Sequence, residues 1–390
     1  MNRGRSDRPP LPAGFGTIWT SVAIDLVGWG IVLPILPLYG ERFTRSPVTL
    51  GILVASFSVM QLLFAPIWGR VSDRYGRRPV LVISLFGTAL GSLVMGLAPA
   101  LWVLFLGRVL DGISGGSVST AHAAVADMAE PEQRARLLGL LGAAFGVGFV
   151  AGPAIGGLAA LFGERVPLFV AATIAGANAV VALRRLPETR PVDTVAHTVE
   201  APRLPAPVRR LIVVVFVATS AFTGFEATFA LLGQERFDLT IASTSAVFVA
   251  IGLLLVFFQG GMVHPAVARF GELRTARAGL VLNVVGFVLV ALAESWWLLV
   301  PAVALLTAGQ GLLAPVLTSM VAGRARVDRR GSVLGLQQSV SALARVVGPI
   351  AAGFLFAHVG VGAPYAAGAV LACLALAVLA GGVREEVTAG

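Results

Sequence analysis

Long apolar runs, separated by short polar segments, make up most of the chain. Twelve runs are predicted to cross a membrane, at residues 13–38, 48–69, 79–98, 101–125, 137–162, 167–184, 210–233, 243–267, 276–294, 297–322, 332–357 and 363–383. A helix needs about 20 residues to cross roughly 30 Å of hydrocarbon, and the runs have about this length. None alternates with the period of two that a membrane strand requires. The pattern predicts an all-α membrane protein with twelve transmembrane helices.

The composition supports this fold class. Of the 390 residues, 57% are hydrophobic and only 13% are charged, whereas soluble domains carry about 25% charged residues. The single cysteine, Cys373, excludes a disulfide framework and a cysteine-rich metal site. Residues 1–12 hold no apolar core before a cleavage site, so we expect no signal peptide. We therefore expect neither a soluble enzyme nor a metal or cofactor site.

The arginines predict the orientation in the membrane. All 29 basic residues are arginine, the formal net charge is +9, and most arginines lie in short segments between apolar runs. This placement is typical of topology control rather than of nucleic-acid binding. If the N-terminus is cytoplasmic, the outer loops hold only Arg42, Arg45, Arg165 and Arg236. We therefore expect a multi-pass protein of the cell (plasma) membrane with both termini in the cytoplasm.

The chain divides into two matching halves. A proline-rich polar stretch, residues 185–209, is predicted to be a cytoplasmic linker between a bundle at 1–184 and a bundle at 210–390. Gly139 and Gly335 mark equivalent positions of the two halves, as do Pro153 and Pro349, which indicates an internal repeat. Two six-helix bundles related in this way place the substrate path of a transporter at the interface between them.

Four segments resemble the major facilitator superfamily. Residues 69–78, Gly-Arg-Val-Ser-Asp-Arg-Tyr-Gly-Arg-Arg, resemble its signature loop almost completely. Residues 148–157, 104–116 and 25–37 resemble motifs of its drug:proton antiporters, the tetracycline-type and multidrug exporters. The second half matches more loosely, since Ala268 stands where the signature loop has aspartate. The resemblance implies the twelve-helix major facilitator fold and transport in the direction of export.

The resemblance also implies a gate on the cytoplasmic side. Asp73, Arg77 and Asp127 are expected to form a charge cluster that latches the halves in one state; the alternative is that these charges only fix the topology. Gly152 and Pro153 lie in a glycine-rich helix that permits close packing and a bend. That helix can act as a gating surface or serve packing alone.

Buried ionisable residues point to proton coupling, because charges within membrane spans are costly and are functional by default. At 1.5 Å rise per residue, Asp25, Arg108, Asp111 and Arg345 fall in one slab near the membrane midplane. We expect Asp25 to carry the proton and Arg108 to modulate it. Asp111 is a second candidate, although it can also form a static pair with Arg108 three residues away.

Five residues are candidates for substrate binding. Glu226 lies among phenylalanines, including Phe225, in a way that suits a lipophilic cation, but the helical rise also allows an interfacial position. Trp29 lies deep in the first span and is expected to line the pocket. Arg345 can hold an anionic substrate or neutralise an acid. Gln338 is a polar residue within a span, where a hydrogen bond between helices is the alternative.

These features predict a proton-coupled secondary transporter that exports small lipophilic molecules by alternating access. No Gly-x-x-x-x-Gly-Lys-Ser/Thr segment occurs, so ATP is not the direct energy source. The alternatives are a sugar or metabolite transporter, a proton symporter for uptake, and a non-transporting sensor. A membrane-embedded enzyme is disfavoured because the four histidines lack ligand spacing. The expected partners are a small molecule, protons and the lipid bilayer, without nucleic acid, and we expect a monomer.

Overall fold

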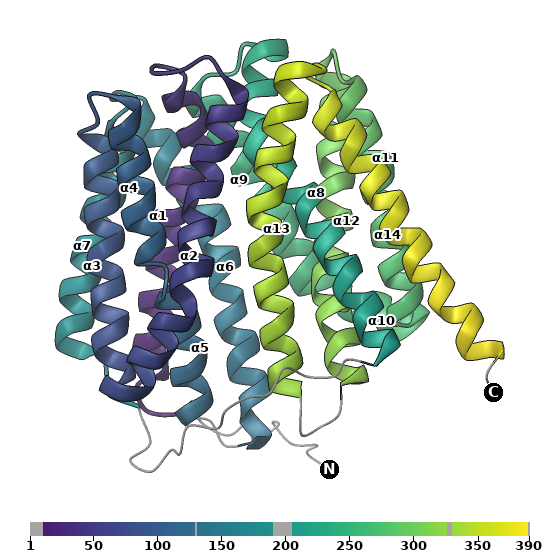
Figure 1. Cartoon of the computed structure of the whole chain (residues 1–390), viewed down its shortest axis with the longest axis horizontal. Helices are drawn as coiled ribbons and strands as arrows, with labels where there is room; N and C mark the ends of the chain where they lie inside the picture. The colour runs from purple at the N-terminus through teal and green to yellow at the C-terminus, as the bar shows by residue number, and fades with distance from the viewer. Residues whose placement is uncertain (1–10, 129–130, 190–204, 326–329, 389–390) are drawn as a thin grey trace, which may run out of the picture.

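The computed structural model describes residues 11–128, 131–189, 205–325 and 330–388. Its helices are α1 (Phe15–Gly40), α2 (Pro47–Tyr75), α3 (Arg77–Gly96), α4 (Leu101–Ile113), α5 (Ser117–Met128), α6 (Pro131–Ala160), α7 (Val166–Arg185), α8 (Ala206–Phe237), α9 (Ile241–Phe257), the π-helix η1 (Phe258–Met262), α10 (Val263–Phe270), α11 (Glu272–Leu292), α12 (Trp296–Arg324), α13 (Arg330–His358) and α14 (Ala363–Thr388) (Figure 1). The described residues contain twelve candidate membrane spans and no strand, which confirms the predicted fold class.

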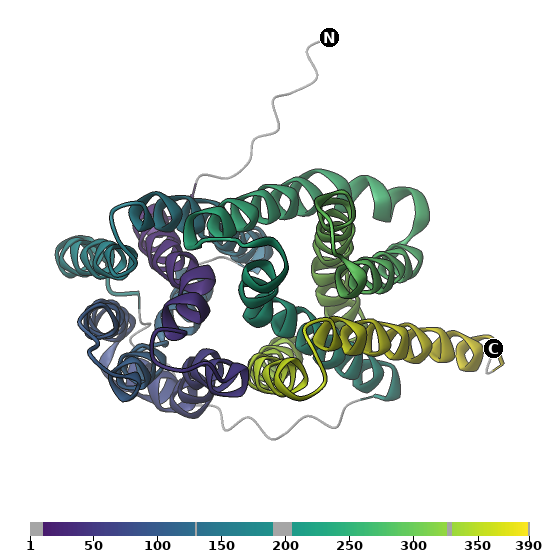
Figure 2. The same ribbon diagram turned by 90° about the horizontal axis from the view of Figure 1, so that it is seen from above.

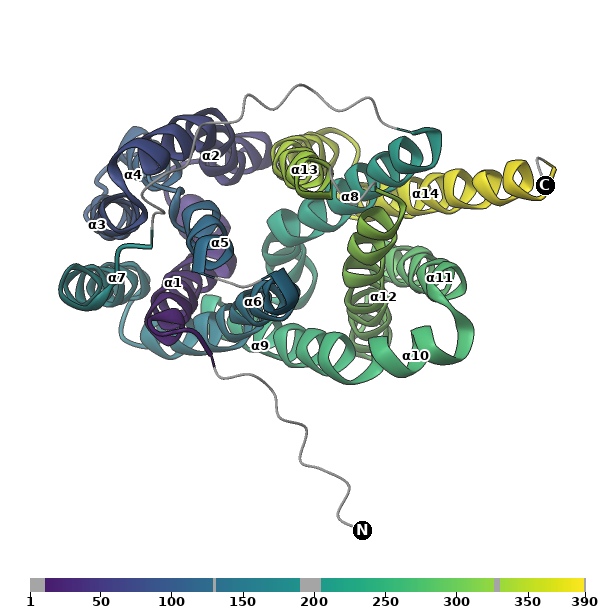
Figure 3. The same ribbon diagram turned by 90° about the horizontal axis from the view of Figure 1, so that it is seen from below.

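The helices form two groups that lie side by side. Figure 2, seen from above, and Figure 3, seen from below, show α1–α7 on one side and α8–α14 on the other. Across the boundary α2 packs on α13 and α6 packs on α9. Of the linker predicted at 185–209, residues 190–204 lie outside the described part of the chain.

Two helices form the centre of the molecule. In α1 and in α8, 83% of the most apolar window is buried, whereas in the other spans at most 50% is buried. These two spans are the first of each half, and they contact each other across the boundary between the halves. A polar side chain on α1 or α8 is therefore placed away from lipid.

The halves close against each other at one end, which we call the distal end; it carries the turns at residues 41–46 and 359–362 (Figure 1). A Cβ atom built on Gly51 of α2 would lie 2.5 Å from the carbonyl oxygen of Pro349 on α13, and one on Gly353 would lie 2.5 Å from that of Pro47. Only glycine permits this close backbone approach.

Apolar side chains complete this distal seal. Leu38 and Leu50 of the first half cluster with Ala230 and Leu231 of the second half. Because these positions occupy the last turns of α1 and α8 and the first turn of α2, the seal lies beyond the middle of the membrane spans. The two halves are thus held together on the side opposite to the start of α1.

The predicted span at 101–125 is not one continuous helix. It is broken at Ser114–Gly116 between α4 and α5. Two side chains of α2 satisfy carbonyl groups at the break: Trp68 Nε1 donates to Ile113 O at 2.5 Å and Gln61 Nε2 donates to Gly115 O at 3.1 Å. Irregular backbone at membrane depth is tolerated where it is buried in protein or lines a cavity. The π-turn η1 interrupts a second span, and such turns are frequent at functional sites.

Candidate functional site

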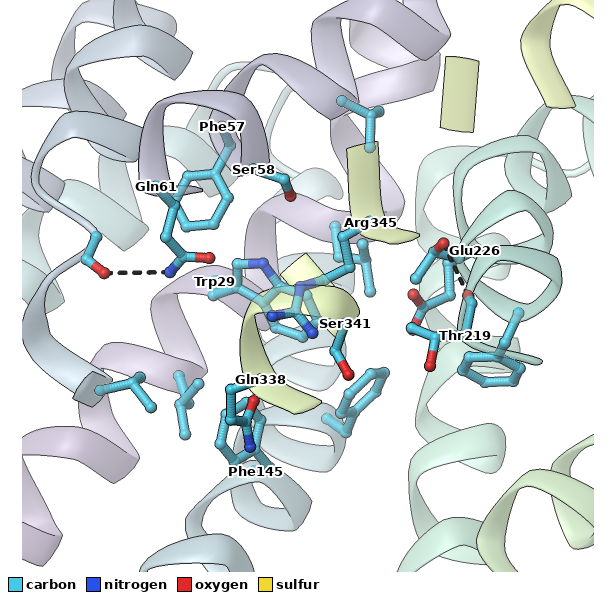
Figure 4. A pocket seen from close by; sticks show the side chains of 18 of the residues that line it. Trp29, Phe57, Ser58, Gln61, Phe145, Thr219, Glu226, Gln338, Ser341 and Arg345 are labelled. Atoms are coloured by element: carbon cyan, nitrogen blue, oxygen red, sulfur yellow. Dashed lines mark hydrogen bonds between the residues drawn. The ribbon is translucent and has the colours of Figure 1, made fainter. Parts of the chain in front are cut away.

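A cavity of about 420 Å³ lies between the two halves. Its walls come from the spans α1, α2, α3 and α4–α6 of the first half and from α8, α9, η1, α12 and α13 of the second. Figure 4 shows side chains that line it, including Trp29, Glu226, Gln338 and Arg345. This volume is within the range of about 300–1,000 Å³ that is typical of small-molecule sites.

Asp25 lies on the first-half wall of the cavity and is 9% exposed. Ser117 Oγ donates a hydrogen bond of 2.6 Å to Asp25 Oδ2, whereas Oδ1 has no partner. Ser117 is the first residue of α5, so the carboxylate sits beside a helix N-terminus that the break has created. The positive end of a helix dipole stabilises an anion. The break therefore helps to place a carboxylate inside the membrane.

Arg108 and Asp111 form an ion pair on α4, with Arg108 Nη1 3.2 Å from Asp111 Oδ2. Both side chains are buried and both line the cavity. The guanidinium also donates from Nη2 to Val54 O at 3.3 Å, and its Cζ lies 4.7 Å from the centre of the Phe57 ring. Arg108 is thus fixed by α2, while its Nε has no acceptor. The structure brings Asp25, Arg108 and Asp111 together as cavity residues of one half.

Glu226 and Arg345 line the second-half wall. Glu226 is 9% exposed, so it lies inside the protein. It interacts electrostatically with Arg345 on α13. Arg345 extends from α13 into the cavity, as Figure 4 shows. Each half therefore contributes at least one acid and one arginine to the same cavity.

Of the other predicted substrate residues, two line the cavity and one does not. Trp29 and Gln338 line the cavity, and the Trp29 ring packs edge-on against Phe149 with centroids 5.2 Å apart. Phe225 does not line it: the side chain is 2% exposed and packs in an apolar cluster with Phe229. Phe222, one turn earlier on α8, lines the cavity instead. Phe225 does not reach the cavity because the rotation of α8 about its axis points this side chain into the second half.

Several cavity residues are not among the predicted site residues. They include Ser117, Phe57 and Gln337. Gln337 is 7% exposed and donates from Nε2 to Thr318 Oγ1 at 2.9 Å, while its Oε1 lacks a donor. The small-residue run at 114–117 was the available signal for Ser117. Gln337 is a polar residue within a span, for which a hydrogen bond between helices is the expected role, as for Gln338. No comparable signal marks Phe57, because its role depends on which face of an apolar helix points inward.

The predicted gate residues form one cluster. Arg77 Nε is 2.8 Å from Asp127 Oδ2, and Arg77 Nη1 is 2.5 Å from Asp73 Oδ1. Glu188, which follows α7, accepts hydrogen bonds from the backbone N–H groups of Arg77 and Arg78 at 2.8 and 3.2 Å. These groups begin α3 and have no partner within the helix. All of these partners belong to the first half, and a latch between the halves stays a prediction.

Gly152 and Pro153 lie inside α6, which continues to Ala160. A Cβ atom on Gly152 would lie 2.6 Å from the backbone of Gly30, so this close approach joins α6 to α1 within the first half. Gly157 of the same helix faces the second half, where a Cβ would lie 2.7 Å from Ser245 Cβ. The gating role of Gly152 and Pro153 stays a prediction.

Comparisons with known proteins agree with this architecture. The family model "Major Facilitator Superfamily" matches residues 18–267 and 262–389. The chain belongs to the major facilitator superfamily. This finding, together with the relatives below, confirms the family of drug exporters predicted from the motifs. This major facilitator chain is thus a multi-pass membrane protein of a transporter family.

Named relatives cover most of the chain. The class C tetracycline resistance protein of Escherichia coli is 33% identical over 342 residues, which are 85% of this chain and 86% of that protein. Multidrug resistance protein 2 of Bacillus subtilis (strain 168) is 26% identical and covers 88% of each chain. The crystal structure of the human organic anion transporter MFSD10 (TETRAN) has a TM-score of 0.74 and 27% identity, and covers 95% of this chain and 100% of that one.

Proposed function

We propose that the protein is a proton-coupled secondary transporter that exports small lipophilic molecules by alternating access. The observation that carries this proposal is the cavity between the halves, where buried acids and arginines from both halves meet. Ionisable groups within membrane spans mark ion and substrate pathways. In this proposal the protein lies in the cell membrane with both termini in the cytoplasm, so the distal end faces the outside. The distal seal then closes the outer side, and the cavity is open toward the cytoplasm.

In this mechanism Asp25 carries the proton. The Ser117 hydroxyl group holds its carboxylate, and Arg108, which α2 and Asp111 keep in place, supplies positive charge to the same half. A proton that reaches Asp25 from outside removes the negative charge and favours release of a cationic substrate. Release of that proton toward the cytoplasm restores the carboxylate for the next substrate.

Aromatic and ionisable side chains make up the proposed substrate site. Trp29 and Phe222 offer flat apolar surfaces, while Glu226, Arg345 and Gln338 offer charge and hydrogen bonds. Sites of this kind combine apolar walls with a few polar groups that fix the orientation of the ligand. Since relatives are tetracycline and multidrug resistance proteins, tetracycline is the first probe, and antibiotic resistance is the expected effect in a cell.

The gate is part of the proposal. The Asp73–Arg77–Asp127 cluster, capped by Glu188, would hold the cytoplasmic end of the first half rigid and latch the halves when that end closes. Gly152 and Pro153 would keep α6 packed on α1 during the motion. We propose a monomer composed of bundles at 1–184 and 210–390 and a linker at 185–209, with no enzymatic activity.

The test is tetracycline transport in proteoliposomes with an acidic lumen. We expect transporters with their cytoplasmic face outward to accumulate tetracycline in the lumen and a protonophore to abolish accumulation. Asp25→Asn should reduce accumulation to near background, because the amide cannot exchange a proton. Glu164→Gln is the control, since it breaks only the half-exposed Arg42–Glu164 surface pair and should transport normally. Normal transport by Asp25→Asn contradicts the role of Asp25, and accumulation that a protonophore does not affect contradicts proton coupling.

A second candidate function is transport of an organic anion. The structurally similar human protein is an organic anion transporter. The observation in favour is Arg345, which lines the cavity and for which no hydrogen bond or salt bridge within 4 Å is found among the described residues, although the charge of Glu226 acts on it. A guanidinium group binds a carboxylate through two parallel hydrogen bonds. Uptake of a fluorescent organic anion that requires Arg345 and is not inhibited by tetracycline favours this candidate.

The same liposomes distinguish uptake from export. A sugar or metabolite symporter moves its substrate in the direction of proton flow, so substrate should leave the lumen with the protons instead of accumulating there. Accumulation against the direction of proton flow is expected only of an antiporter.

A further inference from the structure

A second acid faces the same cavity from the opposite half. Glu226 lies on α8 and Asp25 lies on α1, the first span of each half, and both side chains are 9% exposed. α1 and α8 are also the two most buried spans. The cavity thus has one acid on each of two equivalent central helices.

Glu226 has fewer polar contacts than Asp25. Among the described residues, Glu226 accepts no hydrogen bond and forms no salt bridge, whereas Asp25 accepts one from Ser117. The nearby hydroxyl group of Thr223 donates to backbone carbonyl groups, at 2.9 Å from Thr219 O and 3.3 Å from Ala344 O. A buried carboxylate without hydrogen bonds is costly in its charged form. The charged form of Glu226 therefore depends on a positive charge nearby.

Arg345 is the charged group that acts on Glu226 from a neighbouring helix. α13 packs closely on α8, because a Cβ atom on Gly348 would clash with Ser220 O and with Thr223 Oγ1. Arg345 is one turn before Gly348, so the close approach keeps its side chain near α8. The positive charge of Arg345 favours the charged carboxylate and opposes the cost of burial.

The other helices that pack on α8 contribute few titratable groups. Across the cavity α1 contributes Asp25, and on the far side of α8 α14 contributes Tyr365, which packs against Phe225. The cavity-lining residues of α2, α9 and α12 carry no charge. The charge state of Glu226 therefore depends mainly on Arg345, on burial and on what occupies the cavity.

We propose that Glu226 is a second proton-carrying residue, so that two protons enter for each substrate molecule exported, one through the acid of each half. This rests on the proposed function of the cavity as a site of proton-driven export. In the outward-open state one proton binds the carboxylate of Asp25 and another binds that of Glu226. In the state open to the cytoplasm both protons leave, and the substrate replaces them.

Protonation of Glu226 also changes the net charge of the site. With a charged Glu226, the charges of Glu226 and Arg345 cancel, and the site accepts a cationic or neutral substrate. With a neutral Glu226, Arg345 leaves an uncompensated positive charge that repels a cation. Exchange of two protons for one monovalent cation moves one positive charge inward, so the membrane potential contributes to the driving force.

The first test needs no substrate. Infrared spectra of the purified protein at a series of pH values report the C=O stretch of each protonated carboxyl group. We expect Asp25→Asn and Glu226→Gln each to remove one pH-dependent band, and Asp111→Asn to leave the Glu226 band in place. If the spectrum of Glu226→Gln retains every pH-dependent band of the wild type, the proposal is wrong.

The second test uses tetracycline in proteoliposomes with the membrane potential clamped at zero. For a ten-fold proton gradient, two protons per cycle sustain a tetracycline gradient of about 100-fold and one proton sustains about 10-fold. We expect the larger value for the wild type and the smaller one for Glu226→Gln, while a wild-type gradient of about 10-fold overturns the proposal. If the wild type does not transport tetracycline, the proposed substrate is wrong, and the infrared bands still decide whether Glu226 carries a proton.

Discussion

At the scale of single residues, the proposed proton site depends on one hydroxyl group. Ser117 supplies the hydrogen bond of Asp25, and the second carboxylate oxygen has no protein partner. A hydrogen bond to a charged group contributes about 1.5–3 kcal/mol. Ser117 therefore affects how easily Asp25 holds a negative charge in this conformation.

Replacement of Ser117 by alanine should slow proton release from Asp25. We expect tetracycline accumulation in Ser117→Ala to be slower by roughly ten-fold or more, because about 1.5–3 kcal/mol of stabilisation of the carboxylate is lost. Initial rates at a fixed pH gradient measure the effect. Ser117→Thr keeps the hydroxyl group and should recover most of the rate. Ser119→Ala, whose hydroxyl donates to Gly116 O instead, is the matched control. Equal rates for all three variants would show that Ser117 does not act on Asp25.

At the scale of helices, the sequence predicted where spans lie but not how they are built. The twelve spans follow from apolar length, which hydropathy reports directly. Hydropathy does not reveal the break at Ser114–Gly116, because the small residues there do not interrupt the apolar run. The difference between Phe222 and Phe225 is invisible for another reason: α8 is apolar on all sides, so no pattern of polar residues fixes its rotation. Contacts with neighbouring helices decide both features.

The break depends on two hydrogen bonds from α2, and Trp68 makes the shorter one. Trp68→Phe keeps an aromatic ring but leaves Ile113 O without its donor. An unsatisfied buried carbonyl group costs about 1–3 kcal/mol, so we expect a lower midpoint of thermal unfolding in detergent.

Trp102→Phe is the control for this prediction. Trp102 begins the same span, on α4, but its side chain is 68% exposed. We expect the Trp102 variant to unfold at nearly the temperature of the wild type. If the two variants lose the same amount of stability, the Trp68 hydrogen bond has no special role at the break.

At the scale of the whole molecule, alternating access requires a seal that can open. The distal seal rests on backbone contacts at Gly51 and Gly353 and on a small apolar cluster. Such contacts are tight but few, and they lie at one end of the interface between the halves. Opening them while closing the other end requires only a rigid rotation of one half against the other.

A methyl group at the seal should shift this equilibrium. Gly51→Ala places a Cβ atom 2.5 Å from Pro349 O, which a backbone oxygen cannot avoid without separation of α2 and α13. Spin labels at Arg45→Cys and Val359→Cys, in a Cys373→Ser background, report the distance across the distal end. We expect a longer distance in Gly51→Ala than in the parent protein. Gly142→Ala, whose Cβ meets nothing within 4 Å, should leave the distance unchanged. Identical distances in all three proteins would mean that Gly51 is not part of the seal.

Glu41 should make the seal sensitive to pH at the distal end. It follows α1, and burial raises the pKa of its carboxyl group above the ordinary value; a hydrogen bond with Gln234 lowers the pKa in part, and the charge of Glu235 adds to the increase. Glu41 belongs to the first half, whereas Gln234 and Glu235 belong to the second half. Separation of the halves therefore returns Glu41 to water and its carboxyl group to its ordinary pKa.

The sealed state therefore binds the Glu41 proton more tightly than the open state. As the pH falls through the raised pKa of Glu41, protonation stabilises the sealed state. This stabilisation is complete below the ordinary pKa of the carboxyl group, and it is lost again as the pH rises.

We expect the spin-label distance at the distal end to lengthen with increasing pH. Glu41→Gln should lose the part of this pH dependence that comes from Glu41. Glu164→Gln, which breaks the neighbouring pair with Arg42, should retain it. A pH response that survives unchanged in Glu41→Gln would place its origin in another group.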